Sequence, residues 1–237
     1  MRIVKWDKLP VFMQQEEIRE YYEFLKKKTV SLFFKRVFDI IVSIIMIIVI
    51  SPVILAIAIM IKADSKGPVF YRQERVTQYG RVFRIFKFRS MIVDADTKGT
   101  QITVDNDCRV TRIGRKIRKY KLDELPQLFN VLSGDMSYVG ARPEVQKYVD
   151  MYKPEMLATL LLPAGMTSLA SIYYKDENSL ISNADDVDKV YMEKILPEKM
   201  RWNLKGIMDY SFTGDMKIMM MTAKAATGKD YNNGDIK

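Results

Sequence analysis

The sequence predicts a helix-dominated α+β fold attached to a membrane, and three features of its patterning support this. The first is the uncharged run from Ile40 to Ile61, which as a helix rising about 1.5 Å per residue is long enough to cross the hydrocarbon core of a bilayer. The second is a pair of short strand-like segments around a turn, typical of a small β-hairpin. The third is a strongly basic amphipathic segment followed by an apolar helical face. At 237 residues the chain has room for one large domain beside the membrane segment.

The uncharged run is interrupted in its middle by Ser51 and Pro52. Because proline lacks a backbone donor and clashes with the preceding turn, we expect the helix to bend or break there. Basic residues flank the run at both ends: Lys35, Arg36, Lys62 and Lys66. Basic flanks favour the cytoplasmic side of a membrane, so we predict a re-entrant helix over residues 35–66, hinged at Ser51-Pro52. A kinked spanning helix and a buried core helix are the alternatives.

Composition restricts the chemistry that is open to the chain. Lysine and arginine total 38 against 29 acidic residues, and the net charge of +9 favours anionic partners: a membrane leaflet, nucleotide or lipid phosphates, or nucleic acid. There is no histidine and a single cysteine, Cys108, which excludes imidazole bases, internal disulfides and cysteine zinc sites. The N-terminus lacks the order of a cleavable signal, so we expect the body of the protein in the cytosol.

The pattern divides the chain into four parts: an N-terminal interfacial helix (1–34), the re-entrant helix (35–66), a cytoplasmic region (67–226) and a flexible tail (227–237). In the first part, apolar residues at helical spacing suit either a membrane surface or the protein's own core. In the third, strands are predicted over 69–73 and 82–87, around a turn at 78–80. Residues 97–107 are a polar loop and a candidate lid. Helices are predicted over 187–196, 198–208 and 216–226, the first two separated by Pro197.

Cations gather in two places in the region 67–226. Lys87 and Arg89 alternate along a predicted strand, so they point to one face and could bind a phosphate or a carboxylate. Taken alone, this pattern is explained better by a solvated strand edge than by a binding site. Residues 112–121 carry six cations on an amphipathic helix, which suits anionic lipid, with Arg118 reaching a phosphate site.

Asp123 and Glu124 begin the next predicted helix, residues 122–132. A structural role explains them, because aspartate is a good N-cap and an acid is favoured in the first helical turn. A chemical role is also open, since the pair follows the six cations: one acid could be a nucleophile and the other an oxygen ligand for Mg²⁺. Arg142 is followed by Pro143, which favours an extended geometry and a phosphate clamp.

Taken together and in this order, the motifs resemble the small form of the monotopic phosphoglycosyl transferases, the bacterial sugar transferases that begin exopolysaccharide, capsule, O-antigen and glycoprotein glycan assembly. The resemblance spans roughly residues 35–221. It is carried by the segments Lys35-Arg36-Val37-Phe38-Asp39, Ser51-Pro52, Ser65 to Gln73, Lys87 to Met91, Leu122 to Val131 and Val139 to Pro143. One segment departs from the family, because Pro163 to Ser171 replaces its common Pro-Gly-Ile-Thr-Gly run.

This resemblance implies an enzyme on the cytoplasmic face of the bacterial inner membrane, with residues 67–226 as its catalytic domain. It implies that Asp123 attacks the β-phosphate of a UDP-sugar, expels UMP and passes the sugar phosphate to undecaprenyl phosphate. Glu124 would hold Mg²⁺ while Arg118 and Arg142 contact phosphates, with Lys87 and Arg89 in the same shell. Anionic lipids and downstream glycosyltransferases are the further partners expected, a second copy of the chain is a candidate, and nucleic acid is not expected.

Two rival functions remain open from the sequence. One is a glycosyltransferase that releases UDP and needs no aspartyl intermediate. The other is a non-catalytic, membrane-anchored basic module that recruits a partner or nucleic acid through residues 112–121. That segment lacks interleaved aromatic residues, which counts against binding of single strands.

Overall fold

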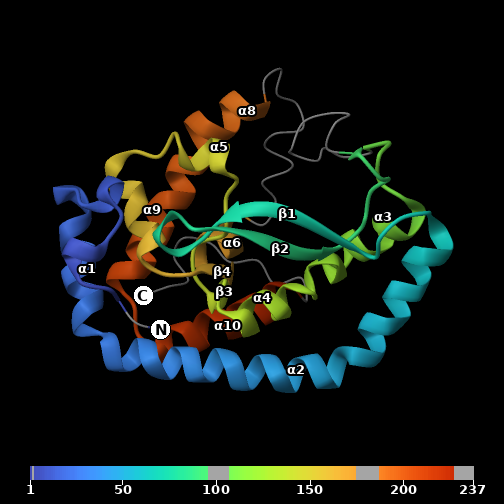
Figure 1. The fold of residues 1–237 in the computed structure, drawn as a ribbon, viewed down its shortest axis with the longest axis horizontal. Helices are drawn as coiled ribbons and strands as arrows, with labels where there is room; N and C mark the ends of the chain where they lie inside the picture. Colours follow the sequence, from blue (N-terminus) through green and yellow to red (C-terminus); the bar gives the residue numbers. More distant parts are fainter. Residues whose placement is uncertain (2, 96–106, 175–186, 227–237) are drawn as a thin grey trace.

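The structure is a computed structural model that describes residues 1, 3–95, 107–174 and 187–226. It is helix-dominated, as predicted, and its described part contains two small sheets (Figure 1). The helices are α1 (Glu16–Lys27), α2 (Thr29–Asp64), α3 (Arg112–Lys119), α4 (Gln127–Ser133), α5 (Gln146–Val149), α6 (Leu169–Tyr173), α8 (Val187–Val190), α9 (Leu196–Met208) and α10 (Phe212–Ala226). The strands are β1 (Phe70–Val76), β2 (Val82–Phe88), β3 (Met136–Val139) and β4 (Ala164–Thr167). Shorter turns are η1 (Trp6–Lys8), η2 (Val11–Met13), η3 (Gln78–Gly80), η5 (Leu122–Glu124), η6 (Pro154–Leu161) and the π-helical turn η7 (Tyr191–Ile195). Nearly all of the candidate lid and the whole predicted tail lie outside the described residues.

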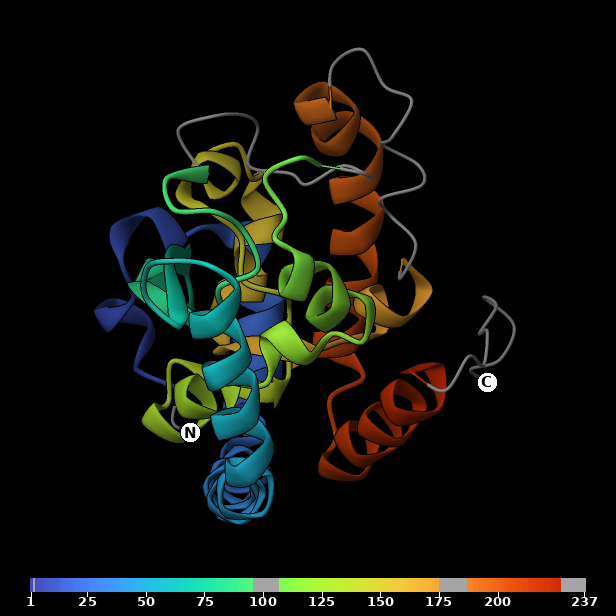
Figure 2. The same cartoon turned by 90° about the vertical axis from the view of Figure 1, so that its right-hand side faces the viewer.

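Helix α2 is continuous over 36 residues and contains Pro52. It bends, so that a long first limb and a shorter second limb run in different directions (Figures 1 and 2). Pro52 cannot donate to the carbonyl four residues earlier, that of Ile48, and the Ser51 hydroxyl donates to this carbonyl instead, at 2.8 Å. The serine therefore satisfies the acceptor that the proline leaves free. Only 11% of the most apolar stretch of α2 is buried, which rules against a core helix.

Both limbs of α2 are attached to the same globular body. On the first limb, Arg36 donates to the carbonyls of Val131 and Leu132 at the C-terminal end of α4, at 2.6 and 2.8 Å. Lys35, on the same limb, forms a buried ion pair with Asp215 of α10. At the end of the second limb, a carboxylate oxygen of Asp64 accepts a hydrogen bond of 2.9 Å from the Ile113 amide at the start of α3.

The predicted hairpin is confirmed, and its register sets which side chains share a face. Strands β1 and β2 pair antiparallel from Phe70 opposite Phe88 to Val76 opposite Val82. Side chains alternate across a strand, and directly paired residues share a face. Tyr71, Gln73 and Arg75 therefore lie on the face that carries Lys87. The same face buries Phe83 and Ile85 against α4 and β3.

The second sheet, the parallel pair β3 and β4, has no counterpart among the predicted elements. It depends on a close backbone approach between Gly140 and Gly165. The Gly165 amide donates to the Ala141 carbonyl at 2.8 Å, and the Gly140 amide donates to Thr167 at 3.0 Å. A Cβ at Gly165 would lie 2.2 Å from the Gly140 nitrogen. Within the segment that departs from the family, this glycine is therefore required by packing.

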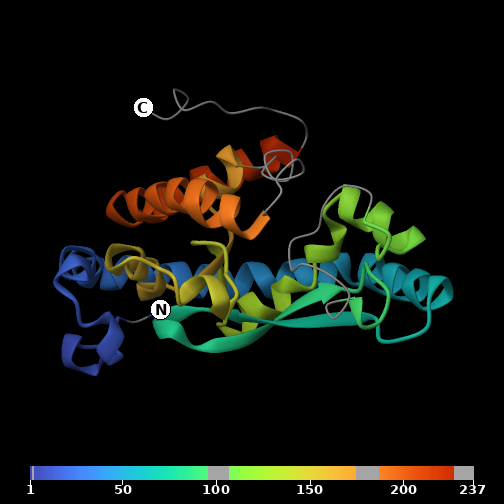
Figure 3. The same ribbon diagram turned by 90° about the horizontal axis from the view of Figure 1, so that it is seen from above.

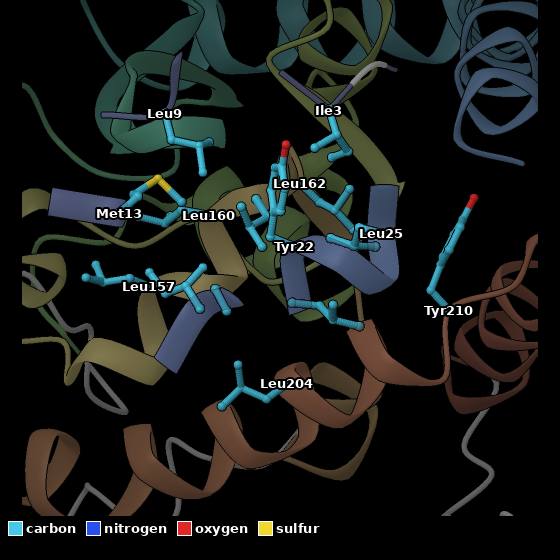
Figure 4. Close-up of a cluster of buried hydrophobic side chains, with 14 of the residues drawn as sticks. Ile3, Leu9, Met13, Tyr22, Leu25, Leu157, Leu160, Leu162, Leu204 and Tyr210 are labelled. Atoms are coloured by element: carbon cyan, nitrogen blue, oxygen red, sulfur yellow. The ribbon is translucent and has the colours of Figure 1, made fainter. Parts of the chain in front are cut away.

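The apolar face of α1 is buried in the protein, which is one of the two alternatives left open by the sequence. Ile18, Tyr22 and Leu25 are at most 1% exposed and pack in one cluster with leucines of η6 and α9 (Figure 4). This face is therefore not available to lipid, and the prediction of an interfacial helix in residues 1–34 is not supported for α1. Seen from above, α9 and α10 lie on the opposite side of the molecule from the β1–β2 hairpin (Figure 3). Pro197 does not separate two helices, because it is accommodated in the first turn of α9.

Candidate active site

The acid pair lies in the short turn η5, between α3 and α4. Lys121 immediately before it has a left-handed backbone with φ of 53°, which turns the chain out of α3. Helix α4 begins only at Gln127, and its N-cap position is Pro126, without a side-chain cap. The predicted helix over residues 122–132 is therefore shorter than expected, and the structural explanation of Asp123 as its N-cap is wrong.

The carboxylate of Glu124 is held by two cations from different parts of the fold. Arg142 donates from Nη2 to Oε1 at 2.5 Å, and from Nη1 to Oε2 at 3.4 Å. Lys87, at the end of β2, donates to Oε1 at 3.3 Å. Burial by itself raises the pKa of Glu124, but the charges of Arg142 and Lys87 outweigh it and hold this pKa well below its usual value. Glu124 is therefore ionised throughout the physiological range.

The pKa of Asp123 is shifted in the opposite direction from that of Glu124. Burial raises its pKa above 3.8, and the adjacent negative charge of Glu124 adds to this effect. The positive charges of Lys87 and of Arg118, in the last turn of α3, act in the other direction. The two neighbouring carboxyl groups are thus distinguished by their surroundings, which is the arrangement expected where two acids have different chemical roles.

The structure brings together five of the predicted residues. Asp123 and Glu124 are adjacent, Lys87 and Arg142 bind Glu124, and the charge of Arg118 acts on Asp123. Arg89 is placed elsewhere. Its side chain is buried and donates to the carbonyls of Lys66 and Ser65 at 2.6 and 2.7 Å, and to the Ser65 hydroxyl at 2.9 Å. Strand β2 ends at Phe88, so the alternation that was expected to align Arg89 with Lys87 stops one residue too early. Through these hydrogen bonds Arg89 connects the segment after α2 to the end of the hairpin.

Arg75 is a cation that sequence reasoning missed. Its positive charge lowers the pKa of Lys87, together with that of Arg142, although burial is the largest cause of this lowering. Arg75 donates to the Gln73 side chain at 2.7 Å and to the Pro143 carbonyl at 3.2 Å. The signal that could have found it is the hairpin register, because Arg75 lies on the same strand face as Tyr71, the residue opposite Lys87.

The acid pair is also a candidate site for a metal ion. Among the described residues there is no group of three or more acidic or cysteine side chains suited to a metal ion. Mg²⁺ usually keeps several waters and is bound by one or two carboxylates together with substrate phosphates. Glu124, ionised and next to Asp123, could supply one such carboxylate, although its Oε1 already accepts hydrogen bonds from Arg142 and Lys87.

Comparison with known proteins agrees with the family that the sequence motifs indicate. The family model described as bacterial sugar transferase matches residues 30–229. A UDP-N-acetylgalactosamine-undecaprenyl-phosphate N-acetylgalactosaminephosphotransferase of Aeromonas hydrophila is 50% identical over 124 residues, 52% of this chain and 29% of the relative. A UDP-glucose:undecaprenyl-phosphate glucose-1-phosphate transferase of Klebsiella pneumoniae is 40% identical over 197 residues, 81% of this chain and 40% of the relative. An undecaprenyl-phosphate galactose phosphotransferase of Salmonella typhimurium is 34% identical over 221 residues, 86% and 42% of the two chains. The chain therefore spans less than half the length of each of these relatives.

Proposed function

This chain belongs to the bacterial sugar transferase family, and on that premise we propose that it transfers a sugar 1-phosphate from a UDP-sugar to undecaprenyl phosphate and releases UMP. The observation that carries the proposal is the acid pair in η5, in which Glu124 is bound by Arg142 and Lys87 while the pKa of Asp123 is raised. Three relatives are named as transferases that use undecaprenyl phosphate as acceptor. Their different named sugars leave the donor of this chain undetermined.

The proposed reaction has two displacements at one phosphorus atom. In the first, a carboxylate oxygen of Asp123 attacks the β-phosphorus of the UDP-sugar, and an aspartyl phosphate bond forms. The bond from this phosphorus to the α–β bridging oxygen breaks, so UMP leaves with the electron pair. In the second, a phosphate oxygen of undecaprenyl phosphate attacks the same phosphorus. The aspartyl bond then breaks, and the Asp123 carboxylate is restored.

The other residues of the site control charge. Arg118, Arg142 and Lys87 supply positive charge for the donor diphosphate and the acceptor phosphate. Glu124 would hold Mg²⁺, which neutralises phosphate charge that otherwise repels the attacking carboxylate. These four residues come from α3, the segment after β3, β2 and η5. The site is therefore assembled by the fold and not by one local motif.

We further propose that α2 enters and leaves the cytoplasmic face of the bacterial inner membrane. Both limbs bind one body through Arg36 and Asp64, and the apolar residues between them are mostly exposed. The Ser51 bond to Ile48 supports this topology, because it satisfies a carbonyl that would otherwise be unpaired in lipid. A soluble nucleotide sugar and a lipid phosphate meet at the membrane surface, where this topology would hold the acid pair.

The test is nucleotide release by the detergent-solubilised protein, with undecaprenyl phosphate, Mg²⁺ and a panel of UDP-sugars. UMP and UDP are assayed separately. We expect UMP release with one or a few donors, abolished in Asp123→Asn and unchanged in Asp209→Asn, where an exposed acid after α9 is replaced. In the absence of acceptor, mass spectrometry should find the sugar phosphate on the peptide that contains Asp123.

Other results of this test support the rival functions. UDP release without a labelled peptide would contradict the aspartyl mechanism and favour a direct glycosyltransferase. No release from any donor, together with salt-dependent binding to anionic vesicles or nucleic acid, would favour the basic binding module.

A further inference from the structure

The segment that carries Arg142 is held on both sides by backbone hydrogen bonds. Before Arg142, Ala141 accepts a bond from the Gly165 amide of β4 at 2.8 Å. After it, the Glu144 carbonyl accepts a bond from the Val76 amide at the end of β1, at 2.9 Å. The position of Arg142 relative to Glu124 therefore depends on how residues 143 and 144 are fixed.

The side chain of Glu144 is fixed by the C-terminal helices. It is 7% exposed, and its Oε1 accepts a hydrogen bond of 2.6 Å from the Tyr191 hydroxyl. Lys199 of α9, itself buried, donates to the same hydroxyl at 3.3 Å. The second oxygen, Oε2, lies 3.9 Å from Nη1 of Arg75. A buried carboxylate is costly unless it is paired, so this chain of contacts holds Glu144 in one orientation.

Tyr191 also begins the π-helical turn η7, between α8 and α9. Such turns are rare and occur frequently at functional sites. Here the turn provides the residue whose hydroxyl reaches Glu144. The π-helical turn and the buried hydrogen-bond chain are separate observations that point to the same place.

We propose that Glu144, Tyr191 and Lys199 form a buried latch that positions Arg142 on Glu124. Arg142 has a side chain 37% exposed, so packing alone does not fix its guanidinium. The latch fixes the backbone two residues away, and Arg75 adds a bond to the carbonyl between them, that of Pro143. These three residues are positioning residues, because they act on the reaction through Arg142. For its consequence on catalysis the inference rests on the function proposed above.

Loss of the Tyr191 hydroxyl has a specific expected effect. It removes the 2.6 Å donor from Glu144, whose carboxylate can then rotate toward Arg75. Arg75 also donates to Pro143, so such a rotation alters the backbone next to Arg142. If Tyr191 had only a structural role, its substitution would lower the stability of the whole fold and would not change the reactivity of Arg142 in particular.

The first arm of the test needs no substrate. In Tyr191→Phe, modification of Arg142 by phenylglyoxal, followed by mass spectrometry of the peptides, should be several-fold faster than in the wild-type protein. Arg112, exposed on α3, is the internal reference. Tyr22→Phe is the matched control, because it removes another buried tyrosine hydroxyl, bonded to the Val4 carbonyl at 3.1 Å. This control should leave the reactivity of Arg142 unchanged.

The second arm measures UMP release. Tyr191→Phe should lower kcat/KM about tenfold, as expected for a misplaced charged contact. The same substitution in an Arg142→Ala background should have no further effect, since the latch acts only through Arg142. Glu144→Gln, which keeps an oxygen acceptor for Tyr191, should retain more activity than Glu144→Ala.

The two arms separate the inference from the proposed function. Unchanged reactivity of Arg142 in both Tyr191→Phe and Glu144→Ala would overturn the latch, as would an equal loss of activity with and without Arg142. A wild-type protein that releases no UMP would contradict the proposed function, and the modification arm would still decide the latch. Melting temperatures of all variants identify any that fail to fold, and if Tyr191→Phe is among them, Glu144→Ala alone decides the modification arm.

Discussion

The side-chain oxygen of Asn130 accepts a hydrogen bond of 2.7 Å from the backbone amide of Phe86. The amide nitrogen of Asn130 donates to the Arg84 carbonyl at 3.1 Å. One side chain of α4 therefore binds two backbone groups on the free edge of β2. Lys87 follows Phe86 directly, and Glu124 precedes α4 by only a few residues. Asn130 thereby helps to set the distance between Lys87 and Glu124.

Asn130→Ala should destabilise the protein. Asn130 is 1% exposed, and its loss leaves the Phe86 amide without its partner, which costs about 2 kcal/mol of unfolding free energy. The measurement is denaturant unfolding in detergent. Asn203→Ala is the control, because the Asn203 side-chain oxygen has no hydrogen-bond partner in the described part of the chain, and its effect should stay within about 0.5 kcal/mol. Equal effects of the two substitutions would contradict the role of Asn130.

The acid limb of the pH–activity profile should report Asp123. Attack requires the carboxylate, so kcat/KM should fall as the pH decreases through the pKa of Asp123. Burial and the charge of Glu124 raise this pKa above 3.8, whereas Lys87 lowers it. Lys87→Gln removes the lowering charge, so the acid limb should move to higher pH. Lys87→Arg keeps the charge and should leave the limb near its original position. A limb that moves to lower pH in Lys87→Gln would show that another group controls it.

Replacement of glycine by alanine should have opposite effects on stability at two positions, Gly165 and Gly206. Gly165→Ala would bring a Cβ to 2.2 Å from backbone atoms of Gly140, so β3 and β4 would have to separate, at a cost of about 3 kcal/mol. Gly206→Ala, within α9, meets nothing within 4 Å and should stabilise the protein by about 0.5–1 kcal/mol through helix propensity. Thermal unfolding of the two variants side by side checks both. A well-folded Gly165→Ala protein would mean that the two strands pack less closely than described.

The proposed topology of α2 can be tested by labelling from each side of the membrane. Cys108 is exposed and is first replaced by serine. Lys27→Cys and Lys66→Cys then introduce single exposed thiols beyond the two ends of the apolar run. In inverted inner-membrane vesicles both should react with an impermeant maleimide, and in spheroplasts neither should. Reaction of the two thiols from opposite sides would establish a spanning helix.

Local patterns predicted the elements that depend on local interactions. The strands on either side of residues 78–80, the basic helix α3 and the disturbance of α2 at Pro52 follow from alternation, helical spacing and the missing proline donor. Each requires only residues that are near one another in the sequence. The acid pair was identified in the same way, although its backbone is a short turn and not the start of a helix.

The remaining features depend on contacts between distant segments. Strands β3 and β4 have four residues each, too few for a readable alternation, and their pairing depends on Gly140 meeting Gly165. The partner of α1 could not be chosen from its amphipathic pattern, because apolar faces suit lipid and protein core alike. Arg75 became visible only through the hairpin register. Arg89 was misassigned because the end of a strand cannot be fixed to one residue from sequence.

The bend of α2, the helix that contains Pro52, has a consequence for the lipid around the protein. In the proposed topology the exposed apolar side chains of both limbs displace acyl chains in one leaflet only. Hydrophobic matching to the full bilayer thickness acts on helices that span it, so it would not set the depth of α2. Lateral packing pressure within the cytoplasmic leaflet would set it instead. Each molecule would enlarge the cytoplasmic leaflet relative to the opposite one. It would therefore favour membrane regions whose cytoplasmic surface is convex.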